Sequence, residues 1–151
     1  VDRSIQNPGS FVQTDVYGSY VLLEAAKRLG LKRFIQISTD EVYGEILGDP
    51  ADEQAPLVAR NPYAASKAAQ DNLTLSFAAL LAPEVKVNSI APALVLFNKD
   101  DDAGYREKTL RKSLMQREGG LDEMQHQVDY LLGSHYVTGR IIHMDGGRHL
   151  V

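Results

Sequence analysis

The chain has 151 residues, of which 44% are hydrophobic and 24% charged, and it contains no cysteine. This composition is typical of one globular domain with a buried core, and the lack of cysteine excludes disulfides and thiolate metal sites. The net charge of -4 gives no electrostatic case for binding nucleic acid. No apolar run approaches the ~20 residues of a membrane span. We therefore expect a cytoplasmic protein that binds neither nucleic acid nor membranes.

Helical and extended patterns alternate along the chain. After the turn at Asn7-Pro8-Gly9, Ser10 is expected to cap a helix over residues 11–29 that ends at Gly30. Periodicity predicts strands at 34–37, 85–90 and 140–144, and further helices at 63–81, 103–117 and 121–132. Residues 45–62 are rich in Gly, Pro, Asp and Ala and are expected to form a long loop.

Strands that alternate with helices favour a parallel α/β sheet with right-handed crossovers. We therefore expect a Rossmann-like, doubly wound sheet of about three strands with flanking helices, in a single domain over residues 1–151. No strand is predicted before the first helix in these residues, so one edge of the first predicted strand would be unpaired. From this we expect either a fragment of a larger domain or association with another chain, as in a homo-oligomer.

Four polar residues follow the predicted strand at 34–37 directly: Ser38, Thr39, Asp40 and Glu41. Ligands of open parallel sheets bind at the carboxyl ends of the strands, so this run indicates a ligand cleft. Two close carboxylates in a partly dry cleft have pKa values that separate, which suits one acid and one base. The competing interpretation is a pair of solvated carboxylates at a helix entry.

Tyr63 and Lys67 lie four residues apart on the helix predicted over 63–81, so they share one face. An ammonium beside a phenol favours the phenolate and lowers the phenol pKa, which would let Tyr63 exchange a proton with an alcohol or carbonyl. Tyr-x-x-x-Lys also occurs by chance on helix surfaces. The nearby strand-end hydroxyls favour the catalytic interpretation.

The stretches VDRSIQNPGSFVQTDVYGSYVLLEAAK, RFIQISTDEVYGE and NPYAASKAAQD make residues 1–70 resemble the extended short-chain dehydrogenases/reductases, especially the dTDP-glucose 4,6-dehydratase family. The resemblance implies a nucleotide-sugar substrate and NAD or NADP as cofactor, which Ser38, Tyr63 and Lys67 would help to bind. Thr39 would hydrogen-bond the reacting sugar oxygen, and Tyr63, supported by Lys67, would be the base. Asp40 would protonate the departing 6-hydroxyl, and Glu41 would remove the C5 proton.

From Ser66 onward, SKAAQDNLTLSFAALLAPEVKVNSIAPALVLFN and the closing YVTGRIIHMDGGRHLV resemble the compact short-chain reductases, especially the dihydromonapterin and pteridine reductases. This resemblance implies a dihydropteridine substrate, NADPH, and Tyr63 as the proton donor. It puts Pro92, Ala93 and Val95 beside the nicotinamide, with Ala93 in the place of the usual glycine. The two resemblances meet near residues 63–70, where a crossover is the simplest explanation.

Neither resemblance finds its glycine-rich Gly-x-x-Gly-x-x-Gly turn in this chain, so the N-terminal βαβ half of the cofactor-binding domain is expected to be missing. Asp15 stands where the dehydratases usually have asparagine, and an ionised carboxylate cannot donate a hydrogen bond. The four histidines lack metal-ligand spacing, so no metal site is expected. Lys99-Asp-Asp-Asp102 is expected to cap the following helix.

Three functions remain open from the sequence. The first is an NAD(P)-dependent enzyme with a dehydratase-like site at Thr39, Asp40 and Glu41. The second is an NADPH-dependent pteridine-type reductase. The third is an inactive fragment or association module without cofactor.

Overall fold

The structure is a computed structural model that describes residues 2–44 and 59–150. Its sheet has three parallel strands in the order β1 (Arg33–Ile37), β2 (Lys86–Pro92) and β3 (Ile141–Met144). Ile37 pairs with Ile90, and Ile90 with Ile142, so the three strands end close together. The predicted α/β class and three-stranded parallel sheet are confirmed.

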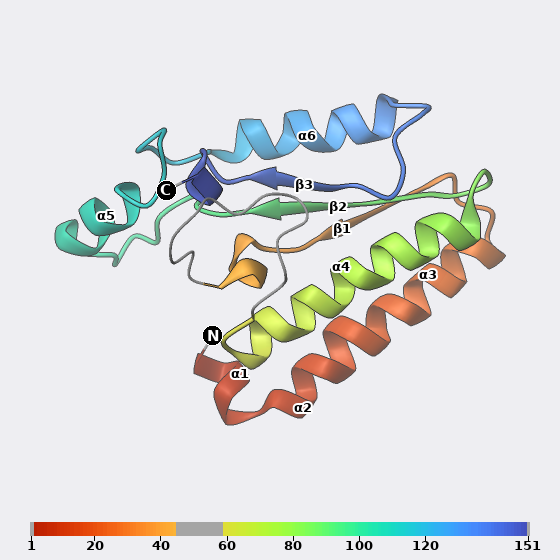
Figure 1. The fold of residues 1–151 in the computed structure, drawn as a ribbon, viewed down its shortest axis with the longest axis horizontal. Coiled ribbons are helices and arrows are strands. Elements are labelled where there is room, and N and C mark those ends of the chain that lie inside the picture. The colour runs from red at the N-terminus through yellow and green to blue at the C-terminus, as the bar shows by residue number, and fades with distance from the viewer. Residues whose placement is uncertain (1, 45–58, 151) are drawn as a thin grey trace.

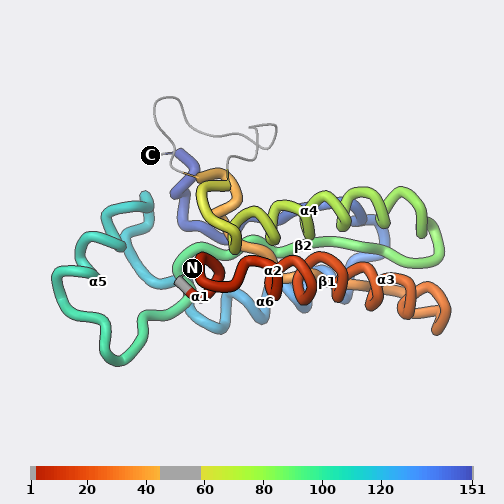
Figure 2. Tube along the Cα trace, turned by 90° about the horizontal axis from the view of Figure 1, so that it is seen from below, coloured from red at the N-terminus to blue at the C-terminus, as the bar shows by residue number. Residues whose placement is uncertain are grey.

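Helices lie on both faces of the sheet (Figure 1). α3 (Gly18–Arg28) and α4 (Pro62–Leu81) lie side by side on one face, and α6 (Leu121–Gly133) lies on the other. α5 (Ala103–Leu110) and its loops stand at the strand-end side of the molecule, away from the C-terminal end of α3 (Figure 2). Because the strands are parallel, their carboxyl ends meet on this same side, where α4 also begins.

The main hydrophobic core lies between α3, α4 and β2. Its buried members are Leu23, Phe77, Ala78, Leu81, Val85 and Val87. This packing fixes the axis of α4 against the sheet, and with it the side chains in the first turns of the helix. The chemistry-bearing residues of α4 are therefore held by apolar contacts farther along the same helix.

The first helical region differs from the prediction in its start and in one turn. α1 (Asp2–Gln6) comes before it, then α2 (Pro8–Phe11), a π-helical segment η1 (Val12–Tyr17) and α3. Ser10 is not the cap, because Asn7 holds that position and the Ser10 hydroxyl donates to the Asn7 carbonyl at 2.9 Å. Val12, at the start of the π-helical segment, is 55% exposed, whereas Leu23 of α3 is 1% exposed.

Other boundaries are close to those predicted, with one exception. Gly30 ends the first helical region with φ of 66°, and Asp102 caps α5 by accepting from the Tyr105 N–H at 2.8 Å, both as predicted. The helix predicted over 103–117 is wrong beyond Leu110, because the chain turns there and the Met115 N–H bonds the Gly146 carbonyl. After Leu110 the chain leaves the helix and lies along the turn after β3.

Three further expectations concern the free edge of the sheet, the loop at 45–62 and membrane spans. Within the described residues β1 pairs with β2 alone, so association through the β1 edge stays a prediction. Most of the predicted loop at 45–62, residues 45–58, lies outside the described residues. In the part of the chain that the structure covers, no helix is both long and apolar enough to span a membrane.

Candidate functional site

The end of β1 and the start of α4 bring Thr39 and Tyr63 together. Thr39 caps the short 3₁₀ helix η2 (Asp40–Tyr43) by accepting from the Glu41 N–H at 3.3 Å. Asn61 caps α4 by accepting from the Ala64 N–H at 2.8 Å, which places Tyr63 in the first turn. The interaction of the Thr39 side chain with Tyr63 lowers the pKa of the phenol, so the two side chains lie within hydrogen-bonding reach. The strand end after β1 and the first turn of α4 therefore lie together.

Lys67 lies one turn farther along α4, on the same face as Tyr63. Its ammonium donates to the Ile37 carbonyl at 3.1 Å, at the last residue of β1. The same Nζ lies 5.9 Å from the centroid of the Tyr63 ring. A phenol and an ammonium are thus presented together at the carboxyl end of the sheet, where an α/β fold binds ligands.

The environment raises the pKa of Tyr63 above the usual 10.0. Burial is the largest cause, and the negative charges of Glu41, Asp15 and Asp40 add to it, while the hydrogen bond with Thr39 lowers the pKa. The prediction that Lys67 lowers this pKa is wrong for this arrangement, because the ammonium is turned to the Ile37 carbonyl. At neutral pH the Tyr63 phenol therefore carries its proton.

Asp40 and Glu41 point to different partners. An Asp40 carboxylate oxygen lies 2.7 Å from the Arg148 guanidinium, in the turn after β3. Burial raises the pKa of Asp40, and Glu41 and Asp145 raise it further, against the lowering effects of Arg148 and Thr39. Glu41 accepts from the Asn61 amide at 3.3 Å. The raised pKa of Asp40 has the direction that an acid requires.

Ser38 is buried beneath this group. It is 3% exposed, and its hydroxyl donates to the Asp71 carboxylate at 2.7 Å. The structure therefore directs the Ser38 side chain into the interior between sheet and helix. Its predicted contact with a cofactor stays a prediction.

The residues predicted beside a nicotinamide lie where β2 ends. Pro92 is the last residue of β2, and the Ala93 N–H bonds the Met144 carbonyl of β3 at 3.0 Å. The carbonyl of Val95 accepts from the Gly120 N–H at 2.9 Å, which ties this segment to the start of α6. Pro92, Ala93 and Val95 are thus brought to the same strand-end side as Tyr63. Their cofactor contacts also stay predictions.

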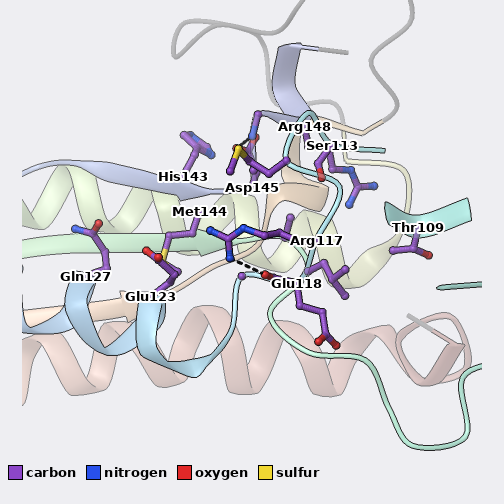
Figure 3. Close-up of a pocket in the computed structure, with 16 residues that line it drawn as sticks. Thr109, Ser113, Arg117, Glu118, Glu123, Gln127, His143, Met144, Asp145 and Arg148 are labelled. Atoms are coloured by element: carbon purple, nitrogen blue, oxygen red, sulfur yellow. Dashed lines mark hydrogen bonds between the residues drawn. The ribbon is translucent and has the colours of Figure 1, made fainter. Parts of the chain in front are cut away.

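A cavity of about 440 Å³ lies beside this segment. It is bordered by Ala93 and Leu94, by the start of α6, and by the turn after β3. Figure 3 shows Glu123 and Gln127 of α6 extending toward Met144, with Arg117 above them. The residues that border it do not include Tyr63, Lys67 or Thr39, so these three side chains lie outside the cavity.

Asp15 and Asp71 are two further acidic residues near Tyr63, and Asp71 was not among the residues predicted from the sequence. The Asp15 carboxylate, in the π-helical segment, accepts from the Ser66 hydroxyl at 2.7 Å. Asp71 lies on α4 at intervals of four residues from Lys67 and eight from Tyr63, so helical spacing could have identified it. No sequence pattern indicated Arg148, because its contact with Asp40 depends on the whole fold. The π-helical segment that carries Asp15 is of a kind that often occurs at functional sites.

A cluster of aromatic and charged groups closes the strand-end side. The Tyr43 hydroxyl lies 3.1 Å from Nε2 of His143, and Nδ1 of His149 lies 2.6 Å from the Asp145 carboxylate. Burial raises the pKa of Asp145, but hydrogen bonds from His149 and Gly147 outweigh it and hold the pKa below the usual 3.8. Among residues 2–44 and 59–150 no group of His, Asp and Glu is arranged to hold a metal ion.

The described residues fit one end of a nicotinamide dinucleotide. The Tyr63 hydroxyl and Lys67 ammonium are donors at the strand ends, suited to ribose hydroxyls, and the segment after β2 offers an adjoining wall. No glycine-rich pyrophosphate turn occurs in the 151 residues. The fit is therefore to the nicotinamide and its ribose.

Comparison with known proteins gives one family match and close partial relatives. Residues 1–101 match the family described as GDP-mannose 4,6 dehydratase. Dihydromonapterin reductase from Escherichia coli K12 is 65% identical over 88 residues, which are 58% of this chain and 37% of the relative. The family match runs through residues 63–70, so it marks no boundary there, and a crossover at those residues stays a proposal.

Solved structures share the fold over most of the chain. Alternative dihydrofolate reductase 1 from Brucella suis, in complex with NADP, aligns with a TM-score of 0.75 at 26% identity, covering 95% of this chain and 56% of that one. A short-chain dehydrogenase from Leptospira borgpetersenii with bound NAD+ aligns with a TM-score of 0.76 at 22% identity, covering 95% and 57%. The chain has the fold of the short-chain dehydrogenases/reductases. Its match spans a little over a third of the length of the curated relatives.

Proposed function

Within the GDP-mannose 4,6 dehydratase family, to which the chain belongs, we propose that Tyr63 and Lys67 serve an NADPH-dependent reduction of a dihydropteridine-type substrate by the whole protein. The observation that carries the proposal is the placement of the Tyr63 phenol and the Lys67 ammonium together at the carboxyl end of the sheet, and the raised pKa of Tyr63 agrees with it. A phenol that keeps its proton at neutral pH is suited to donate it, which is the need of a reduction. An oxidation would need the phenolate first.

The proton balance follows from the positions of the side chains. NADPH, when bound, supplies the hydride to one atom of the reduced C=N or C=O bond. Tyr63 gives its proton to the other atom, and the phenolate left behind is favoured by the hydrogen bond from Thr39, which lowers the pKa of Tyr63. Thr39, hydrogen-bonded to Tyr63, keeps the phenol directed to the strand ends.

Likeness to reductases supports the same direction. The Escherichia coli relative at 65% identity is named a dihydromonapterin reductase. The Brucella suis neighbour is named an alternative dihydrofolate reductase and was solved with NADP. Both names refer to reduced pteridine rings, so we assign this substrate class to the proposal.

A 4,6-dehydratase reaction on a nucleotide sugar is the second candidate. The family match over residues 1–101 and the raised pKa of Asp40 favour it, because the reaction needs an acid for the departing hydroxyl. In this candidate Glu41 would remove a carbon-bound proton, and Tyr63 would act as a base. The protonated state of Tyr63 makes it the weaker candidate.

The test is NADPH consumption by the protein with a dihydropteridine, beside product analysis with a nucleotide sugar. We expect turnover of the dihydropteridine, with Tyr63→Phe lowering kcat at least about 100-fold because the proton donor is lost. Tyr136→Phe is the matched control, since Tyr136 is 99% exposed and outside the site. Full activity in Tyr63→Phe would refute both reactions. Sugar turnover without pteridine turnover would favour the dehydratase.

A further inference from the structure

We propose that Asp71 is a positioning residue that sets the contact between Thr39 and Tyr63 through its hydrogen bond with Ser38. Asp71 is 1% exposed and lies on α4, two turns after Tyr63. Neither proposed reaction uses it. A buried carboxyl group needs partners that satisfy it, and here both partners are serine hydroxyls of the sheet.

The contacts of Asp71 join the helix to two strands. One carboxylate oxygen accepts from the Ser38 hydroxyl at 2.7 Å, directly after β1. The other accepts from the Ser89 hydroxyl at 2.9 Å, inside β2. Ser38 itself is tied to β2, because its N–H bonds the Ile90 carbonyl at 2.8 Å. A single carboxyl group therefore fixes α4 against two neighbouring strands.

The two sides of the Tyr63 site both depend on this joint. On one side, α4 carries Tyr63 and Lys67 in register with Asp71. On the other, Thr39 follows Ser38 directly in the chain and hydrogen-bonds Tyr63. If the bond between Asp71 and Ser38 is lost, the strand end that carries Thr39 is released from the helix that carries Tyr63.

The charges around Asp71 agree with a held, buried group. Burial raises its pKa above the usual 3.8 overall, while the bonds from Ser38 and Ser89 and the charges of His143 on β3 and Lys67 on α4 oppose that rise. The two hydroxyls therefore favour the ionised form that accepts both bonds. The charges that shift the pKa of Tyr63 most are those of Glu41, Asp15 and Asp40, so the proposal assigns Asp71 an influence through position.

The test measures the pKa of Tyr63 in the 151-residue chain by NMR of tyrosine labelled with carbon-13 at the ring carbon that bears the hydroxyl, with Tyr63→Phe assigning the signal. Ser38→Ala breaks one bond to Asp71 without changing any charge. We expect it to raise the pKa of Tyr63, because the lowering hydrogen bond from Thr39 weakens. Ser89→Ala is the matched control, since it removes the other hydroxyl from the same carboxylate and should leave that pKa unchanged.

Asp71→Asn and the double variant with Ser38→Ala complete a cycle. We expect Asp71→Asn to raise the pKa of Tyr63, because the amide offers one acceptor oxygen in place of two, and the double variant to match the single ones, because all three weaken the same contact between residue 71 and Ser38. The opposite shift in Asp71→Asn would show a direct charge effect and overturn the proposal. Equal shifts in Ser38→Ala and Ser89→Ala, or none in Ser38→Ala, would overturn it too. The two serine variants decide the matter even if Asp71→Asn does not fold.

A kinetic readout deepens the inference and rests on the proposed reduction. Asp71→Asn should lower kcat at least about tenfold while KM stays within about twofold, because a small misplacement of reacting groups slows chemistry more than binding. Failure of the two proposals can be told apart. An active Tyr63→Phe variant refutes the reduction, whereas an unshifted Tyr63 pKa in Ser38→Ala refutes the role of Asp71.

Discussion

The Arg148 guanidinium lies 2.7 Å from the Asp40 carboxylate, so the segment after the last strand closes over the short helix η2 that comes after the first strand. The two side chains are 35% and 12% exposed, which makes the pair less screened than an ordinary surface ion pair. This contact links the segment that resembles the dehydratases with the closing segment that resembles the reductases.

Arg148→Gln should destabilise the protein by about 1 kcal/mol at neutral pH. Arg148 lowers the pKa of Asp40, so its loss raises that pKa further. The deficit should shrink as the pH falls through the folded-state pKa values of Asp40 in the two proteins, which both lie above the usual 3.8, because below them Asp40 is protonated in either folded protein. Chemical denaturation at several pH values measures it. Arg111→Gln is the control, because its pair with Glu107 is far more exposed; an equal loss there would contradict the prediction.

Asp145→Asn should cost about 2 kcal/mol at neutral pH, since the carboxylate accepts charge-assisted bonds from His149 and the Gly147 N–H. The folded-state pKa of Asp145 lies below 3.8, so its contribution is present above that value and is lost as the pH falls through the lowered pKa. Thermal unfolding against pH checks this. Asp129→Asn, at an exposed position of α6, should show little change. A deficit for Asp145→Asn that stays constant in acid would contradict the assignment.

Variants of Asn61 should separate its cap of α4 from its contact with Glu41. Asn61→Ala removes the cap of α4 and should cost about 1 kcal/mol, whereas Asn61→Ser keeps a capping hydroxyl and should cost a few tenths. Both variants lose the amide donor to Glu41. Thermal unfolding reports the cap, and the pKa of Tyr63, which the Glu41 charge raises, reports the position of Glu41. Equal stability of the two variants would show that the cap contributes nothing.

The Tyr63 phenol should ionise above pH 10, the ordinary tyrosine pKa, in an ultraviolet titration of the protein minus that of Tyr63→Phe. Glu41→Gln should bring the Tyr63 pKa down, because Glu41 is the charge that raises it most. Thr39→Val should move it up, because the lowering hydrogen bond is lost. Opposite shifts in these two variants are the expected signature. A shift of the same sign in both would contradict the assigned causes.

The sequence alone was enough for the features that depend on near neighbours in the chain. The order of strands and helices, the end of the first helical region at Gly30, the cap at Asp102 and the shared face of Tyr63 and Lys67 follow from periodicity and local backbone preferences. The position of Thr39, Asp40 and Glu41 after the carboxyl end of β1 followed from the predicted strand that precedes them. The π-helical turn and the early end of α5 did not, because contacts with distant segments override local propensity there.

Only the tertiary structure decided which groups meet and in what state. Arg148 reaches Asp40, and Asp71 joins Ser38 to Ser89, through strands and helices far apart in the chain. The direction of the Tyr63 pKa depends on burial and on carboxylates contributed by other elements, so it was wrong when inferred from Lys67 alone. Spacing along a helix determines which side chains share a face, whereas desolvation and long-range charge determine what those side chains do.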